Sequence, residues 1–188
     1  MADRISLSKE WYARGVELLD NFEKGEKARS LFESYIYLWI SLTIAAKEYC
    51  GCAGKVFKNN KGQKTVDKDE IIFWANQRQT QILTMLKENE HLILELCNRK
   101  GSDSNSPIMD VGSDEIIKFH KEFIRYWEGD AKYVEPKRTI NTYIQILNRV
   151  RNNLFHGGKS FKLESDIQLL ALTCPLLKET TKICIETL

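Results

Sequence analysis

The stretch Thr139–Gly158, "TINTYIQILNRVRNNLFHGG", decides the fold class. Its apolar residues recur in steps of three and four, the spacing of one face of an α-helix. Two glycines close the stretch, and a glycine after a helix commonly supplies the left-handed turn that ends it. The sequence therefore predicts a helix over about residues 139–155, whose apolar face carries Ile140, Tyr143, Ile144, Leu147, Val150 and Leu154.

Helical spacing recurs along nearly the whole chain, whereas the alternation typical of β-strands is weak. Further helices are expected over about residues 6–22, 27–49, 67–98, 114–126 and 163–188. Pro175 lies within the last of these and is expected to kink or restart it, because proline has no backbone N–H donor. We therefore expect an all-α protein, an antiparallel up-and-down helical bundle with additional helices and long loops.

Two segments interrupt the helical pattern. The first, "CGCAGKVFKNNKGQKT" (residues 50–65), carries a run of lysines, and the second, "RKGSDSNSPIMDVGSD", is built mainly of Gly, Ser, Asn and Asp. Such residues favour turns and loops. The chain has 188 residues, which suits one domain. We predict a single helical domain over residues 1–188 with a flexible loop near residues 99–113.

The composition is that of an ordinary globular protein. Hydrophobic residues make up 43% of the chain and charged residues 29%, and the net charge is only +2. No apolar run is long enough for a membrane span, and the start of the chain has no signal-peptide core, so no membrane contact and a cytoplasmic location are expected. The five cysteines form no CxxC pair, so we expect reduced thiols rather than a zinc site, and neither a metal nor a cofactor.

Arg151 is the unusual residue of the helix at residues 139–155. It lies four residues after Leu147 and three before Leu154, so it belongs to the apolar stripe. A guanidinium that faces the core needs a partner or an anionic ligand. One explanation is structural: Arg151 reaches the edge of the bundle or pairs with a core carboxylate. The other is that it binds an anionic substrate.

His156 follows Arg151 and directly precedes the two glycines. The helix dipole favours a protonated imidazole at this C-terminal position, whereas the charge of Arg151 disfavours it. Such an imidazole titrates near neutral pH, where proton transfer in catalysis is effective. The structural alternative is an ordinary helix end, in which the histidine interacts with terminal carbonyl groups.

The surroundings of these two residues are basic. Residues 136–163 contain no Asp or Glu but six positively charged side chains, namely Lys137, Arg138, Arg149, Arg151, Lys159 and Lys162. A basic zone around a titratable histidine is typical of a surface that handles phosphate. A second group of lysines at residues 55–68 is either a solvated loop or an extension of this surface.

The residues "RNNLFH" resemble the Arg-x4–6-His signature of the HEPN superfamily, with Arg151, four intervening residues and His156. Asn152 matches the polar residue that often follows the arginine in that family. The resemblance covers the motif closely and the rest of the chain only at the level of an all-α fold. It implies a helical bundle that forms a homodimer, in which two copies of the motif make one composite cleft.

The resemblance also implies an activity. Many HEPN proteins are metal-independent endoribonucleases of toxin–antitoxin or phage-defence systems. The ribose 2′-OH would attack the adjacent phosphate and give a 2′,3′-cyclic phosphate, with His156 moving protons, Arg151 stabilising the phosphoryl charge and Asn152 orienting the site. Arg149 and Lys159 would contact RNA. The expected partners are RNA, a second copy of the chain and a cognate antitoxin protein.

One departure and two alternatives accompany this hypothesis. HepT-type toxins often carry a tyrosine two residues after the histidine, and Gly158 stands there in this chain, so regulation by nucleotide addition at that tyrosine is not supported. The first alternative is a catalytically inactive HEPN-fold module that binds a nucleotide, RNA or a protein partner. The second is an unrelated helical interaction protein in which the motif is only a helix end.

Overall fold

The computed structural model describes residues 2–25, 27–57, 67–98, 135–156 and 164–188. Every regular element in these ranges is a helix, which confirms the all-α fold. The helices are α1 (Ala2–Glu23), α2 (Ala28–Cys52), α3 (Asp67–Gln77), α4 (Gln79–Glu88), α5 (Glu90–Asn98), α7 (Pro136–His156) and α8 (Glu164–Glu186). None of the helices in these ranges is both long enough and apolar enough to cross a membrane.

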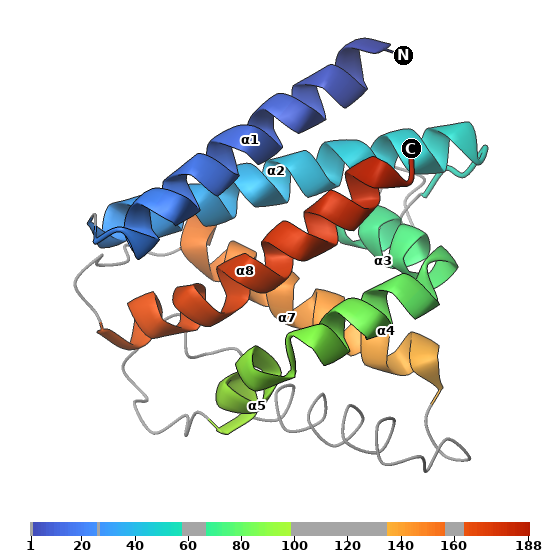
Figure 1. Cartoon of the computed structure of the whole chain (residues 1–188). Coiled ribbons are helices and arrows are strands. Elements are labelled where there is room, and N and C mark those ends of the chain that lie inside the picture. Colours follow the sequence, from blue (N-terminus) through green and yellow to red (C-terminus); the bar gives the residue numbers. More distant parts are fainter. Residues whose placement is uncertain (1, 26, 58–66, 99–134, 157–163) are drawn as a thin grey trace.

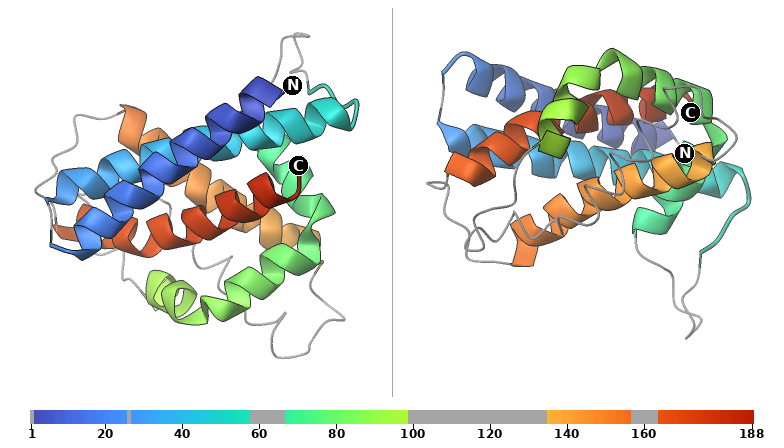
Figure 2. Two further views of the ribbon diagram at one scale, coloured as in Figure 1. Left: turned by 45° about the horizontal axis from the view of Figure 1, so that its top comes forward. Right: turned by 90° about the horizontal axis from the view of Figure 1, so that it is seen from below.

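The four long helices run in alternating directions, as the bundle prediction requires. Figure 1 shows α1 running antiparallel to α2, with α8 packed beside α2 and α7 crossing behind α8. The shorter helices α3, α4 and α5 follow one another along the edge of the bundle, and the view from below in Figure 2 shows α7 in front of the others. Each helix in the described ranges contributes buried or partly buried residues to one hydrophobic cluster.

Helix α7 carries the apolar face that its sequence predicts. Ile140, Ile144, Leu147 and Val150 are fully buried, and Leu154 packs at the edge of the core. The helix begins three residues earlier than expected, at Pro136, where proline is well accommodated because the first helical N–H has no partner in the helix. It ends at His156.

Two buried tyrosines attach α7 to its neighbours. The hydroxyl of Tyr35 in α2 donates to the carbonyl of Leu147 at 2.7 Å. The hydroxyl of Tyr143 in α7 lies 3.1 Å from the carbonyl of Leu176 and 2.7 Å from Oγ1 of Thr180, both in α8. Burial raises the pKa of both phenols above the ordinary value, so both remain neutral donors. The position of α7 against α2 and α8 is therefore set by hydrogen bonds as well as by packing.

The single helix expected over residues 67–98 is wrong, because the chain forms three helices there. The helical backbone breaks at Arg78, with φ −121° and ψ 34°, and at Asn89, with φ −105° and ψ 26°. The side-chain amide of Asn89 donates to the carbonyl of Met85 at 2.9 Å, a local bond that competes with helix continuation. The breaks let the apolar residues of α3, α4 and α5 all reach the same core.

Helix α8 continues through Pro175, so the expected restart of the helix does not occur. The residues on either side of the proline, Cys174 and Leu176, are fully buried. Packing of this segment against the core offsets the hydrogen bond that proline cannot make. The predicted helix at residues 114–126 and the predicted loop at residues 99–113 lie outside the described residues.

The aromatic side chains differ in burial. Trp39 and Trp74 are buried in the core. Trp11 is partly exposed and stacks on Tyr37, with ring centroids 5.1 Å apart. His91 is exposed, and Trp127 and His120 lie outside the described residues.

Candidate functional site

Arg151 lies in the last two turns of α7, and its side chain is directed toward α2. The guanidinium carbon is 6.0 Å from the ring centroid of Trp39 and 4.9 Å from that of Phe155. Trp39 belongs to the core, whereas Phe155 is 53% exposed. With 28% of its side chain exposed, Arg151 is held at the edge of the bundle between buried and exposed aromatic rings. This placement agrees with its position on the apolar stripe.

A carboxylate from a distant part of the sequence lies beside Arg151. Oδ2 of Asp67, the first residue of α3, is 3.7 Å from Nη2 of Arg151. The other carboxylate oxygen, Oδ1, accepts a hydrogen bond from Nζ of Lys47 in α2 at 2.8 Å. Asp67 also benefits from the positive end of the α3 dipole. One carboxylate therefore joins three helices, and the basic stretch around Arg151 does have an acidic neighbour.

Asn152 binds the guanidinium directly. Nη1 of Arg151 donates to Oδ1 of Asn152 at 2.8 Å. The expectation that Asn152 orients His156, a phosphate or a ribose stays a prediction. Nε of Arg151 and Nδ2 of Asn153 are both buried without a hydrogen-bond partner among the residues that the structure describes. A buried donor without a partner is costly, so this end of α7 has unused hydrogen-bonding capacity.

His156 is the last residue of α7, as the two following glycines predict. Its side chain, together with Lys159, lies outside the described residues. Five residues of continuous helix separate the directions of positions 151 and 156 by about 140°. Arg151 and His156 therefore do not share one face of α7, and a common site requires the helix end, a second copy of the chain or both.

Arg149 lies on another part of α7. Its side chain is exposed, and two residues of helix place it about 160° away from Arg151 around the helix axis. The structure therefore does not bring Arg149 and Arg151 to one face. The residues it does bring to Arg151 are Asp67, Asn152, Trp39 and Phe155, with Lys47 joined through Asp67.

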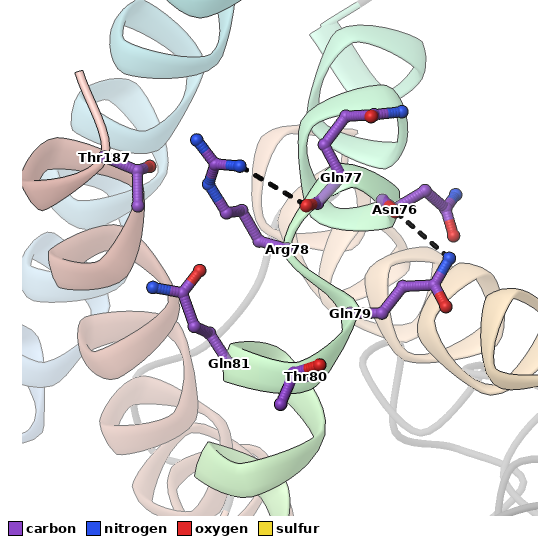
Figure 3. A pocket seen from close by; sticks show the side chains of 7 residues that line it. All are labelled: Asn76, Gln77, Arg78, Gln79, Thr80, Gln81 and Thr187. Atoms are coloured by element: carbon purple, nitrogen blue, oxygen red, sulfur yellow. Dashed lines mark hydrogen bonds between the residues drawn. The ribbon is translucent and has the colours of Figure 1, made fainter.

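A separate polar pocket of about 480 Å³ opens where α3 ends and α4 begins. Figure 3 shows Thr187, just after α8, across the pocket from Arg78 and Gln81. Nη1 of Arg78 donates to the carbonyl of Gln77 at 3.4 Å, and Nε2 of Gln79 donates to that of Asn76 at 3.1 Å. The lining consists of amides, hydroxyls and one guanidinium, so it supplies hydrogen bonds but no group that takes up protons near neutral pH.

The described residues contain no group of three or more His, Cys, Asp or Glu side chains arranged to hold a metal ion. Of the cysteines whose side chains are described, Cys50, Cys174 and Cys184 are buried and Cys52 is exposed, and all four are free thiols. The three buried cysteines belong to the buried hydrophobic residues of the protein.

Comparison of the chain with protein-family models, with curated proteins and with solved structures gives no match.

Proposed function

We propose that this protein is a HEPN-type, metal-independent endoribonuclease that acts as a toxin or phage-defence effector in the cytoplasm. The observation that carries the proposal is Arg151 itself, a partly exposed guanidinium placed on the core side of the helix that ends at His156. The "RNNLFH" motif and the helical architecture support it. RNA is the substrate, and an antitoxin protein is the expected inhibitor.

The proposed reaction follows from the two side chains. The ribose 2′-OH loses its proton to the imidazole of His156 and attacks the neighbouring phosphorus. The bond to the 5′-oxygen breaks, and that oxygen takes up a proton, leaving a 2′,3′-cyclic phosphate and a free 5′-OH. Arg151 stabilises the negative charge on the phosphoryl oxygens, for which the planar guanidinium is well suited. Asn152, bonded to Arg151, keeps the guanidinium in position.

A homodimer is part of the proposal. Positions 151 and 156 point in different directions around α7, so one chain does not readily bring both to one phosphate. Phe155 lies between them in sequence and is 53% exposed, although it is a large apolar side chain. A second copy packed over this end of α7 would cover Phe155 and supply the other half of the cleft. Sedimentation of wild type and of Phe155→Glu tests this: the variant is expected to be monomeric and inactive.

A second candidate function is a catalytically inactive HEPN-fold module that binds a nucleotide, RNA or a protein partner. The contacts of Arg151 favour this function, because Nη2 already pairs with Asp67 and Nη1 already donates a hydrogen bond to Asn152. An assay of RNA cleavage in excess EDTA separates the two functions. Loss of activity in Arg151→Ala and in His156→Ala supports the ribonuclease, whereas binding of RNA without cleavage by a dimer supports the module.

A further inference from the structure

A second pocket lies at the opposite end of α2 from the α1–α2 connection. It has a volume of about 470 Å³ and is formed by the start of α1, the last turns of α2, the residues directly after α2, and α3. This volume falls within the roughly 300–1,000 Å³ of sites that hold small molecules. Arg151 does not line it, so the inference does not depend on the proposed ribonuclease activity.

Part of the pocket is apolar. Its apolar lining comes from three elements and consists of Leu7, Ile44, Val56 and Phe57. Leu7 is 42% exposed and Val56 is 65% exposed, which makes them two of the few large hydrophobic side chains that the described surface leaves open to water. An apolar ligand body in the pocket would remove part of this surface from water.

The charged lining is mainly positive. Arg4, Lys47 and Lys55 line the pocket together with one carboxylate, Glu70. Lys47 is engaged by Asp67, but Arg4 is 73% exposed and its contact with Glu48 is long, at 4.0 Å. Nζ of Lys55 lies 5.9 Å from the ring centroid of Phe73, and no carboxylate pairs with it in the described part of the chain. Arg4 and Lys55 therefore remain able to bind an anionic group.

We infer that this pocket binds an organic anion with an apolar body, such as an acyl or aryl carboxylate. The apolar body would lie against the apolar lining, and Arg4 and Lys55 would supply positive charge to the carboxylate. Charge complementarity decides the class of ligand, because the lining carries three cations and one carboxylate, Glu70. A neutral apolar molecule leaves the excess positive charge unused, and an organic cation is repelled by it.

Gly51 provides a sharp way to close the pocket. It lines the cavity, and a Cβ added there would meet no atom within 4 Å. Gly51→Leu should therefore fold normally and adds a bulky side chain to the lining of the pocket. Gly51→Ala, which adds a single methyl group, serves as the matched variant, and Arg29→Gln removes an exposed arginine from the other end of α2 as a charge control.

The experiment is calorimetric titration of the full chain with decanoate below its micelle concentration, and with decanol and decyltrimethylammonium as probes of equal chain length. Decanoate is expected to bind one molecule per chain, and decanol roughly tenfold more weakly because it lacks the ion pairs. Arg4→Gln and Lys55→Gln should each lower the affinity for decanoate about threefold, which is the contribution of one partly exposed ion pair. Gly51→Leu should abolish binding, and Arg29→Gln should leave it unchanged.

Titration with 2-naphthoate tests a ligand with an aromatic body in the same way. The inference is supported if either carboxylate binds and the variants change its affinity as described above. The inference is overturned if neither carboxylate binds saturably to wild type. It is also overturned if Gly51→Leu, shown by circular dichroism to be folded, binds as well as wild type, or if decyltrimethylammonium binds as tightly as decanoate. RNA cleavage is not measured here, so either result leaves the proposed function to its own test.

Discussion

Arg151 of α7 and Asp67 of α3 face each other with Nη2 and Oδ2 3.7 Å apart, and the same carboxylate binds Lys47 of α2. This relationship gives the guanidinium a defined position without enclosing it. The two side chains are 28% and 30% exposed, so the pair is screened by water and is worth at most about 1 kcal/mol. In the proposed function, an RNA phosphate would therefore compete with Asp67 for Arg151 at low cost.

Asp67→Asn should strengthen RNA binding. The substitution removes a negative charge next to the guanidinium that would receive the phosphate, so affinity should rise about twofold to fivefold at low salt. Filter binding of a 2′-deoxy-substituted RNA, which cannot be cleaved, measures this. Asp69→Asn makes the same charge change in the same helical turn and should have a smaller effect. Equal effects of the two variants would show that Asp67 acts only through the net charge.

The glycines of α1 and α2 should respond to alanine in opposite ways. A Cβ on Gly15 would lie 2.7 Å from Cγ and 2.9 Å from Cδ2 of the buried Leu38, whereas one on Gly51 meets open space. Gly15→Ala should destabilise the fold by about 1–3 kcal/mol through overpacking. Gly51→Ala should be neutral or stabilising by up to about 1 kcal/mol, because alanine favours helix. Urea unfolding checks both, and similar midpoints would contradict the close approach of α1 to α2.

Tyr143→Phe should lower the free energy of unfolding by about 1 kcal/mol, because it removes the buried hydroxyl that joins α7 to α8. Tyr37→Phe is the matched control, since no hydrogen bond is seen for that hydroxyl among the described residues and its ring stacks on Trp11. Chemical denaturation of the two variants beside wild type gives the difference. If Tyr37→Phe loses as much stability as Tyr143→Phe, the hydrogen bonds of Tyr143 do not stabilise the packing of α7 against α8.

The fold class was predictable because helical periodicity is local. The buried face of α7 and its end at His156 follow directly from the spacing of apolar residues and from Gly157-Gly158. The breaks at Arg78 and Asn89 were not predictable in this way, since the apolar pattern runs through both positions. The pairing of Arg151 with Asp67 depends on how α3 packs against α7, and nothing near Arg151 in the sequence indicates it.

The thiols should differ in reactivity. Burial, with a further contribution from Glu70, raises the pKa of Cys50 to about 11, and burial raises that of Cys184 well above its ordinary value. In native protein at pH 8, iodoacetamide should modify the exposed Cys52, while Cys174 and Cys184 should react only after unfolding. Peptide mass spectrometry identifies the sites. Rapid native labelling of Cys174 would contradict its place in the core.

The same shifts set a pH dependence of stability. An unfolded thiol ionises near pH 8.5, whereas Cys50 in the folded chain ionises near pH 11, so the unfolded state loses its proton first as the pH rises. The stability that this difference contributes is fully present below about pH 8.5 and declines as the pH rises toward 11. Urea midpoints between pH 7 and pH 11 should fall for wild type and fall less steeply for Cys50→Ala.

Cleavage of RNA by the purified protein in excess EDTA decides whether the chain is a metal-independent ribonuclease. Total RNA is incubated with wild type, Arg151→Ala, His156→Ala and the folded control Arg29→Gln, and the ends of the products are analysed. Wild type and the control should give products with 2′,3′-cyclic phosphate and 5′-OH ends, and the cleavage rate should fall by at least about 10²-fold in both motif variants. Cleavage that persists in His156→Ala, or that EDTA abolishes, would contradict the proposed function.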